Sequence, residues 1–157
     1  MRKLLLLCTC LVLLCAGAFA QKGGEAYFGY STFTSGKNGW NGDAGINVAK
    51  TFMVEGDLGG YYSHNNTIHS FMGGVKVQSP VRSHGFTPWG HFLFGGSHVH
   101  NLSGDSDTAR SWALGGGVDA KVYKKIALRL TADVFHTRFY DNGDLHLRAG
   151  AGFVYRF

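Results

Sequence analysis

The chain has 157 residues, 15 Lys and Arg against 10 Asp and Glu, and a formal net charge of +5. It contains 24 glycines, 12 phenylalanines, 7 tyrosines and 3 tryptophans but only 2 prolines. Glycine and aromatic residues in this proportion favour an all-β chain. The charge is too mild, and too little clustered among aromatic residues, to indicate a nucleic-acid binder, so no nucleic-acid partner is expected.

The first twenty residues have the organisation of a secretory signal peptide. Arg2 and Lys3 precede an apolar run over residues 4–16, and Ala18-Phe19-Ala20 supplies a small-residue cleavage site. The run is shorter than the ~20 residues that a membrane-spanning helix needs. We expect residues 1–20 to be removed, which leaves 137 of the 157 residues as one domain over residues 21–157. All three cysteines lie in the removed segment, so neither a disulfide nor a metal site is expected from them.

The remaining chain divides into segments in which apolar and polar residues alternate, as in β-strands with one apolar face. Eight such segments are predicted, with bounds uncertain by a few residues, at 25–34, 43–50, 52–62, 68–78, 86–99, 110–123, 126–137 and 145–157. The connections between them are predicted to alternate in length, with long ones at 35–42, 63–67, 100–109 and 138–144. An up-and-down barrel with long loops at one end and short turns beside its termini has this pattern.

Residues 145–157 form the most informative segment. Leu145, Leu147, Phe153, Tyr155 and Phe157 fall on one face, and the chain stops on the last of them. Thirteen residues are long for a strand of a soluble protein, whereas a bilayer requires roughly 9–11 tilted residues. The segment therefore predicts a membrane-crossing strand.

The other face of each predicted strand decides between two kinds of barrel. In a soluble lipocalin-like barrel the apolar face lines the interior, whereas in a membrane barrel it faces lipid and the polar face lines the lumen. The apolar faces here are large and continuous, and the opposite faces collect charges among small residues. We expect a lumen charge network, since eight strands enclose a space that side chains fill. Its members are predicted to be Glu55, Asp57, Lys76, Asp119, Lys121, Arg129, Asp133 and Arg148.

Together, these features resemble the eight-stranded outer-membrane β-barrel family, which includes the transmembrane domain of outer membrane protein A and the small opacity-type barrels. The resemblance spans nearly all of residues 21–157. Its most specific parts are the acidic segment Val54-Glu55-Gly56-Asp57-Leu58-Gly59-Gly60-Tyr61-Tyr62 and the terminal Tyr155-Arg156-Phe157. It implies an all-β, antiparallel, up-and-down transmembrane barrel in the bacterial outer membrane. The implied partners are outer-membrane lipid, lipopolysaccharide and, through the strand ending in Phe157, the barrel assembly machinery.

For function, the sequence favours a non-enzymatic barrel, structural or adhesin-like, without a cofactor and monomeric because a closed barrel has no free edge. In this hypothesis the lumen charges hold the bore closed. The acids Asp105, Asp107, Asp141 and Asp144 lie in predicted loops, either as cation ligands near lipopolysaccharide phosphates or as solvated turn residues.

Three alternatives remain open. Small barrels also include lipid A deacylases and acyltransferases, and His136 would suit a base at the lipid interface, but Arg138 stands two residues on where a serine nucleophile would be needed. His98 and His100 share a strand face, yet two ligands fall short of a zinc site. A narrow pore is the third alternative, although charged side chains leave little open bore in eight strands.

Overall fold

The computed structural model describes residues 23–64, 66–80, 85–101, 104–139 and 142–157, so the predicted signal peptide at 1–20 lies outside the described residues. Eight strands follow one another along the chain. They are β1 (Gly24–Phe33), β2 (Asn38–Asn47), β3 (Phe52–Tyr62), β4 (Asn66–Gln78), β5 (Phe86–Asn101), β6 (Ser106–Lys121), β7 (Ile126–Phe139) and β8 (Asn142–Arg156). No helix in the described ranges has the length and apolar character to span a bilayer.

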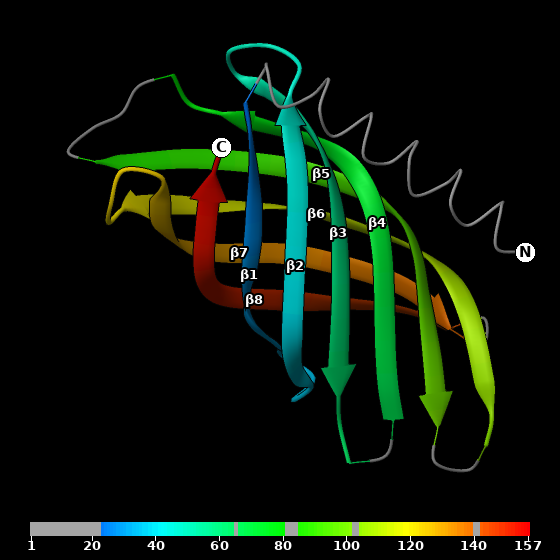
Figure 1. Ribbon diagram of the computed structural model, residues 1–157. Helices are drawn as coiled ribbons and strands as arrows, with labels where there is room; N and C mark the ends of the chain where they lie inside the picture. The colour runs from blue at the N-terminus through cyan, green and yellow to red at the C-terminus, as the bar shows by residue number, and fades with distance from the viewer. Residues whose placement is uncertain (1–22, 65, 81–84, 102–103, 140–141) are drawn as a thin grey trace, which may run out of the picture.

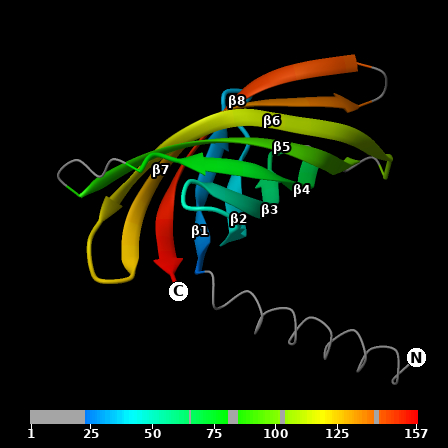
Figure 2. The same ribbon diagram turned by 90° about the horizontal axis from the view of Figure 1, so that it is seen from above.

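Each strand pairs antiparallel with its neighbour in sequence, and β8 closes the sheet by pairing with β1. Figure 1 shows β1 to β4 at the front, with β6, β7 and the first part of β8 passing behind them at a steep angle; the last part of β8 rises beside β1. In Figure 2 the end of β8 lies beside the start of β1. The prediction of an eight-stranded up-and-down barrel is therefore confirmed. We call the end that holds both termini the terminal end and the opposite end the loop end.

The strand register shows how strongly the strands tilt. A row of paired residues starts at Gly24 and ends at Leu147, whose carbonyl accepts a hydrogen bond from the amide of Thr34 (3.0 Å). Between them the row passes through Ile46, Val54, Val75, Phe92, Leu114 and Val134. One circuit therefore advances from residue 24 to residue 34 on β1. Ten residues of ~3.3 Å rise over eight strands spaced ~4.8 Å apart correspond to a tilt of about 40°.

Side chains alternate between a polar inside and an apolar outside. Phe28, Leu58, Phe94, Leu114 and Phe153 are each more than half exposed on the outer face. Glu55, Lys76, Arg129 and Arg148, in contrast, are buried inside the barrel. Apolar residues outside and charges inside are expected where hydrocarbon surrounds the barrel, so the lipocalin alternative is wrong.

The predicted bounds of the second strand and of three long loops are wrong. The second strand was expected at 43–50 but spans Asn38–Asn47, and the predicted loop 35–42 shrinks to the residues between Phe33 and Asn38. The expected long loops at 100–109 and 138–144 also lie mostly within strands. β5 continues to Asn101 and β6 begins at Ser106, while β7 continues to Phe139 and β8 begins at Asn142. By the strand bounds, the longest connection is 79–85, at the terminal end. Polar residues beyond the apolar belt were mistaken for loops although they continue the hydrogen-bonded ladder.

Several glycines within the strands lie where two backbones approach closely. A Cβ on Gly74 would lie 1.9 Å from the carbonyl oxygen of Phe92, and one on Gly95 would lie 2.2 Å from that of Phe71. No side chain fits at these positions, so the tightly curved sheet requires glycine there.

Candidate functional site

Charged side chains from all eight strands fill the half of the lumen nearer the terminal end. Six carboxylates are buried with Lys76, His91, Arg129 and Arg148, and Arg156 closes the terminal end with its side chain 25% exposed. The carboxylates belong to Glu25, Asp43, Glu55, Asp57, Asp119 and Asp133. Alternation places these residues inward, and buried charges persist only where they are paired and hydrogen-bonded.

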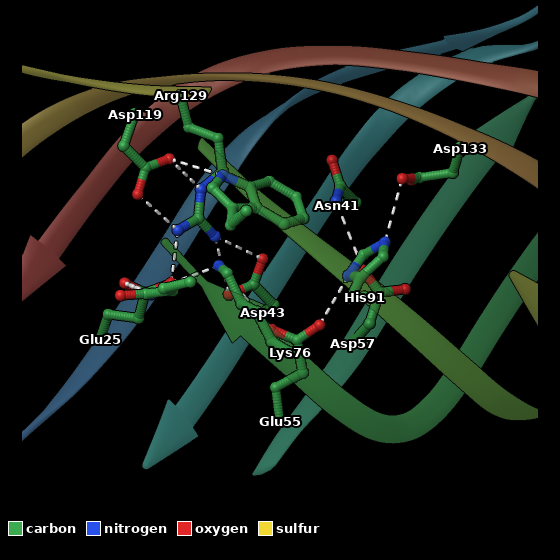
Figure 3. Close-up of polar contacts among 12 residues, drawn as sticks. Glu25, Asn41, Asp43, Glu55, Asp57, Lys76, His91, Asp119, Arg129 and Asp133 are labelled. Atoms are coloured by element: carbon green, nitrogen blue, oxygen red, sulfur yellow. Dashed lines mark hydrogen bonds and ion pairs between the residues drawn. The ribbon is translucent and has the colours of Figure 1, made fainter. Parts of the chain in front are cut away.

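Arg129 on β7 is the centre of the charges nearest the terminal end. Its Nε donates to Oδ1 of Asp119 (2.7 Å), and its Nη1 lies 3.1 Å from Oδ2 of Asp43. Its Nη2 donates to Oδ2 of Asp119 (2.9 Å) and to Oε1 of Glu25. Figure 3 shows the guanidinium held between these three carboxylates. One side chain thus joins β7 to β1, β2 and β6.

Glu25 and Asp119 each have further partners. Lys76 Nζ lies 2.5 Å from Oε1 of Glu25, and Arg156 Nη2 donates to Oδ2 of Asp119 (2.6 Å). The indole of Trp89 donates to Oδ1 of Asp119 (2.9 Å), and its ring lies 4.0 Å from Lys76 Nζ. Lys76 therefore makes an ion pair and a cation–π contact at the same time. We call Glu25, Asp43, Lys76, Asp119, Arg129 and Arg156 the terminal cluster.

A second group of charges lies toward the loop end. His91 Nδ1 is 2.6 Å from Oε1 of Glu55, and its Nε2 is 3.0 Å from Oδ1 of Asp133 (Figure 3). Arg148 Nε donates to Oδ2 of Asp133 (2.8 Å), and its Nη1 donates to Oδ1 of Asp57 (3.2 Å). With an acceptor at each ring nitrogen, His91 can satisfy both carboxylates only as a cation. We call Glu55, Asp57, His91, Asp133 and Arg148 the central cluster.

Between the central cluster and the loop end, the residues that line the bore are apolar. Arg148 Nη1 donates to the hydroxyl of Tyr61 (2.9 Å), which marks the transition. The ring of Phe33 packs edge-on against Tyr61 and Phe135, with centroids 4.6 and 5.2 Å apart. We call the buried residues here the apolar plug; they are Phe33, Tyr61, Ile68, Met72, Leu93, Val99, Ala113 and Phe135. The lumen is thus filled by salt bridges in one half and by packed rings in the other.

The structure places seven of the eight predicted network residues inside the barrel and in contact with partners. Lys121 is the exception, and its assignment to the lumen was wrong. It shares a strand face with Asp119, but it is the last residue of β6 and its side chain is exposed at the rim. Alternation gives the face of a side chain and not its height along the barrel.

Glu25 and Asp43 also belong to the network but were not predicted to, and each stands at the first position of its predicted strand. His91 and Arg156 are two further members that the predicted network lacks. A carboxylate at a strand end, in phase with inward residues further along, would have been the signal for Glu25 and Asp43.

The residues behind the alternative functions lie elsewhere. His136 is on the outer face, where its ring stacks on Trp112 with centroids 5.4 Å apart. His98 Nδ1 lies 2.8 Å from the hydroxyl of Thr108, so the pair His98 and His100 faces outward. Within the described ranges no group of three His, Cys, Asp or Glu residues could hold a metal ion. Asp141 and the side chain of Asp144 lie outside what the structure describes.

Comparison with known proteins agrees with this architecture. The family model of the outer membrane protein beta-barrel domain matches residues 6–157. No curated protein sequence matches the chain.

Several solved structures share the fold at low sequence identity. The N-terminal β-barrel domain of OprF from Pseudomonas aeruginosa superposes with a TM-score of 0.64 at 14% identity, covering 87% of this chain and 98% of that one. Neisserial surface protein A (NspA) gives 0.61 at 11% identity, covering 85% and 93%. Ail, the attachment invasion locus protein of Yersinia pestis, gives 0.56 at 14% identity, covering 87% and 99%.

Proposed function

Because the chain belongs to the family of outer membrane protein beta-barrel domains and is located in the bacterial outer membrane, we propose that it is a sealed, non-enzymatic barrel. It acts through its outer surface and loop end, in a structural or adhesin-like role. The observation that carries this proposal is the filled bore, with the terminal and central clusters in one half and the apolar plug in the other. A barrel without a passage offers only its surfaces to partners.

The lumen network acts in this proposal as a closure and not as a gate. Arg129 and Arg148 each contact carboxylates from opposite walls, so an open path would require breaking several buried ion pairs at once. Leaving a buried charge without its partner costs about 3–5 kcal/mol per pair. Thermal fluctuation therefore opens the bore rarely.

Two observations favour this proposal over lipid A hydrolysis and over a pore. His136 stacks on Trp112 instead of facing a serine or threonine nucleophile, and the neighbouring outward residue on β7 is Arg138. The lumen, where a pore would run, holds interlocked side chains. The adhesin-like role takes support from Ail, whose name describes attachment and invasion by that protein.

Planar-bilayer recording on the purified barrel distinguishes sealing from conduction. We expect no unitary current steps in 1 M salt, and regular steps would refute a sealed barrel. Lipid A from cells with and without the gene should have the same acyl pattern, and a missing or added chain would establish an enzyme instead.

Attachment is tested at the β5–β6 hairpin, which has the longest strands of the barrel. Replacing residues 102–105 by a two-residue Asn-Gly turn should reduce attachment of producing cells to host-cell monolayers. The control shortens the connection 79–85 at the terminal end by the same two residues. Equal attachment in both variants and the wild type would contradict the adhesin-like role.

For assembly, we propose that β8 and its terminal Phe157 engage the barrel assembly machinery, and that the folded protein is a monomer within outer-membrane lipid. β8 pairs with β7 and β1, so the finished barrel has no free edge. Phe157→Ala should slow membrane insertion in cells while leaving detergent refolding unchanged.

A further inference from the structure

Two histidines face outward side by side where β4 and β5 approach the loop end. The β4–β5 register sets His69 directly opposite His98, so their Cβ atoms lie about 4.5–5.5 Å apart. Both share the outer face with Phe71 and Phe94, because alternate residues of a strand point the same way. His69 is exposed and His98 is half-buried. Spacing along the sequence pairs His98 with His100, whereas the register of the barrel brings His69 beside it.

The histidine pair lies beyond the membrane boundary. Phe94 on β5 is paired with Trp112 on β6, and tryptophan is enriched at the height of lipid headgroups. His98 is four residues further toward the loop end than Phe94. With ~3.3 Å per residue and a tilt of about 40°, this separation is about 10 Å along the barrel axis. An ion dissolved in the external solution can therefore reach the pair without entering the hydrocarbon.

The ring of His98 is held in an orientation that suits a metal ligand. Its Nδ1 lies 2.8 Å from the hydroxyl oxygen of Thr108 on β6. When Nδ1 carries the proton and donates it to this hydroxyl, Nε2 keeps its lone pair. Histidines that bind metals commonly donate the other ring N–H in this way, which fixes the tautomer and the direction of the ring. Thr108 thus occupies the place of an orienting residue.

The ring of His69 can turn toward His98. It lies on the side of β3, where it makes an edge contact with Tyr62 at a centroid distance of 6.3 Å. Because His69 is exposed, rotation about its side-chain bonds moves it toward β5 through solvent. Changes of rotamer are common when a surface binds a partner. The backbone register therefore provides the short separation, and the side chain of His69 supplies the adjustment.

Two imidazoles determine which metal fits. In the described ranges no group of three His, Cys, Asp or Glu residues could hold a metal ion, so water has to complete the coordination. Zinc uses three or four protein ligands. Cu²⁺ instead accepts tetragonal nitrogen and oxygen ligands, suits imidazole, and binds a given site of such ligands more tightly than the other divalent ions of its row. A pair of imidazoles with water is therefore best suited to Cu²⁺.

We propose that His69 and His98 form a surface site for Cu²⁺. Nε2 of His98 and the imidazole of His69 are neighbouring ligands, and water oxygens fill the remaining equatorial positions. Thr108 is a positioning residue that holds His98. The bound ion joins β4 to β5 near the loop end of both strands. This copper-binding function is separate from the closed lumen and does not depend on the adhesin-like role.

The test titrates the untagged mature barrel, refolded in detergent micelles, with Cu²⁺ alone in a non-coordinating buffer. Calorimetry gives the affinity, and electron paramagnetic resonance counts the coordinated imidazole nitrogens. Wild type should bind one Cu²⁺ through two imidazoles. His69→Gln should weaken binding about 100-fold and leave one imidazole, because the gain from two linked ligands is lost. The matched control, His100→Gln, removes the next exposed histidine on the same face and should change neither value.

A second set of variants tests the positioning role of Thr108. Thr108→Val keeps the shape of the side chain but removes the acceptor for Nδ1 of His98, so Cu²⁺ affinity should fall about 10-fold while the two-imidazole spectrum remains. Thr108→Ser restores an acceptor and should restore the affinity. The control Thr67→Val, on the outer face of β4 opposite His100, should leave binding unchanged. Heat-shifted gel mobility verifies folding of every variant.

Three results would overturn the proposal. The first is a wild-type spectrum without two coordinated imidazoles, and the second is a loss of affinity in His100→Gln as large as that in His69→Gln. The third is displacement of Cu²⁺ by an equal concentration of Mg²⁺, which would indicate a site made of oxygen ligands. Unchanged affinity in Thr108→Val would refute the positioning role.

Discussion

Replacing Arg129 by methionine tests whether the lumen charges stabilise the barrel as a paired network. The substitution removes the donor to Asp119, Asp43 and Glu25 while roughly conserving the length of the side chain. Glu25 keeps Lys76, and Asp119 keeps Arg156 and Trp89. Asp43 forms its ion pair with Arg129, so it becomes the carboxylate left without compensation. A buried charge that loses its partner costs about 3–5 kcal/mol.

A double-mutant cycle with Asp43→Asn makes this expectation specific. The second substitution removes the uncompensated charge, so the double variant should be more stable than the sum of the single effects by about 1–3 kcal/mol. Arg156→Met is the comparison: its side chain is 25% exposed at the rim, and both of its carboxylate partners keep Arg129, so its loss should cost less than the loss of Arg129. Urea unfolding in detergent micelles, followed by tryptophan fluorescence, gives the free energies. Additive effects of Asp43→Asn and Arg129→Met would refute a coupled network.

Three further predictions concern the wall and the plug. Gly152→Val should prevent closure between β1 and β8, because its Cβ would lie 2.3 Å from the carbonyl oxygen of Phe28. The unboiled variant should then migrate on a gel as unfolded protein, whereas the control Ala151→Val, on the outer face, should fold. Leu114→Arg, in the lipid-facing belt, should destabilise the barrel by about 2–4 kcal/mol and Val122→Arg, beyond the end of β6, by about 0–1 kcal/mol, as measured by urea unfolding. Phe135→Ala should cost about 3–5 kcal/mol yet produce no bilayer conductance, since the terminal and central clusters still fill the bore; current steps in that variant would show that the plug alone seals it.

Alternation predicted the strand faces well because its period is a property of the backbone. Asp57, Asp133 and Arg148 could each be assigned to the lumen from their phase relative to outward leucines and phenylalanines. The network partners could not be predicted, since Arg129 meets Asp43 across the barrel, 86 positions away in sequence. That contact depends on the stagger of the strands around the barrel, the shear, and the shear is known only when the register of every strand pair is known.

The second strand shows a different limit. Residues 38–42 read Asn-Gly-Trp-Asn-Gly, a composition typical of turns. In the barrel Asn41 points inward and its amide donates to Asp57 (3.4 Å). Gly39 is required because a Cβ there would lie 1.9 Å from the carbonyl oxygen of Gly60. A strand with polar inward residues and with glycines at close backbone contacts thus has the composition of a loop, which is why its sequence was predicted as one.

The central claim is that the barrel keeps its charges inside and exposes its apolar face to lipid. Its most direct test is the lipid exposure of two tryptophans. Trp89 is buried in the lumen beside Asp119, whereas Trp112 lies on the outer face against His136. Single-tryptophan variants that retain one or the other are refolded into vesicles of brominated phosphatidylcholine, which quenches indole fluorescence by contact. We predict strong quenching of Trp112 and little quenching of Trp89. Quenching of Trp89 with protection of Trp112 would contradict a barrel with its charges inside.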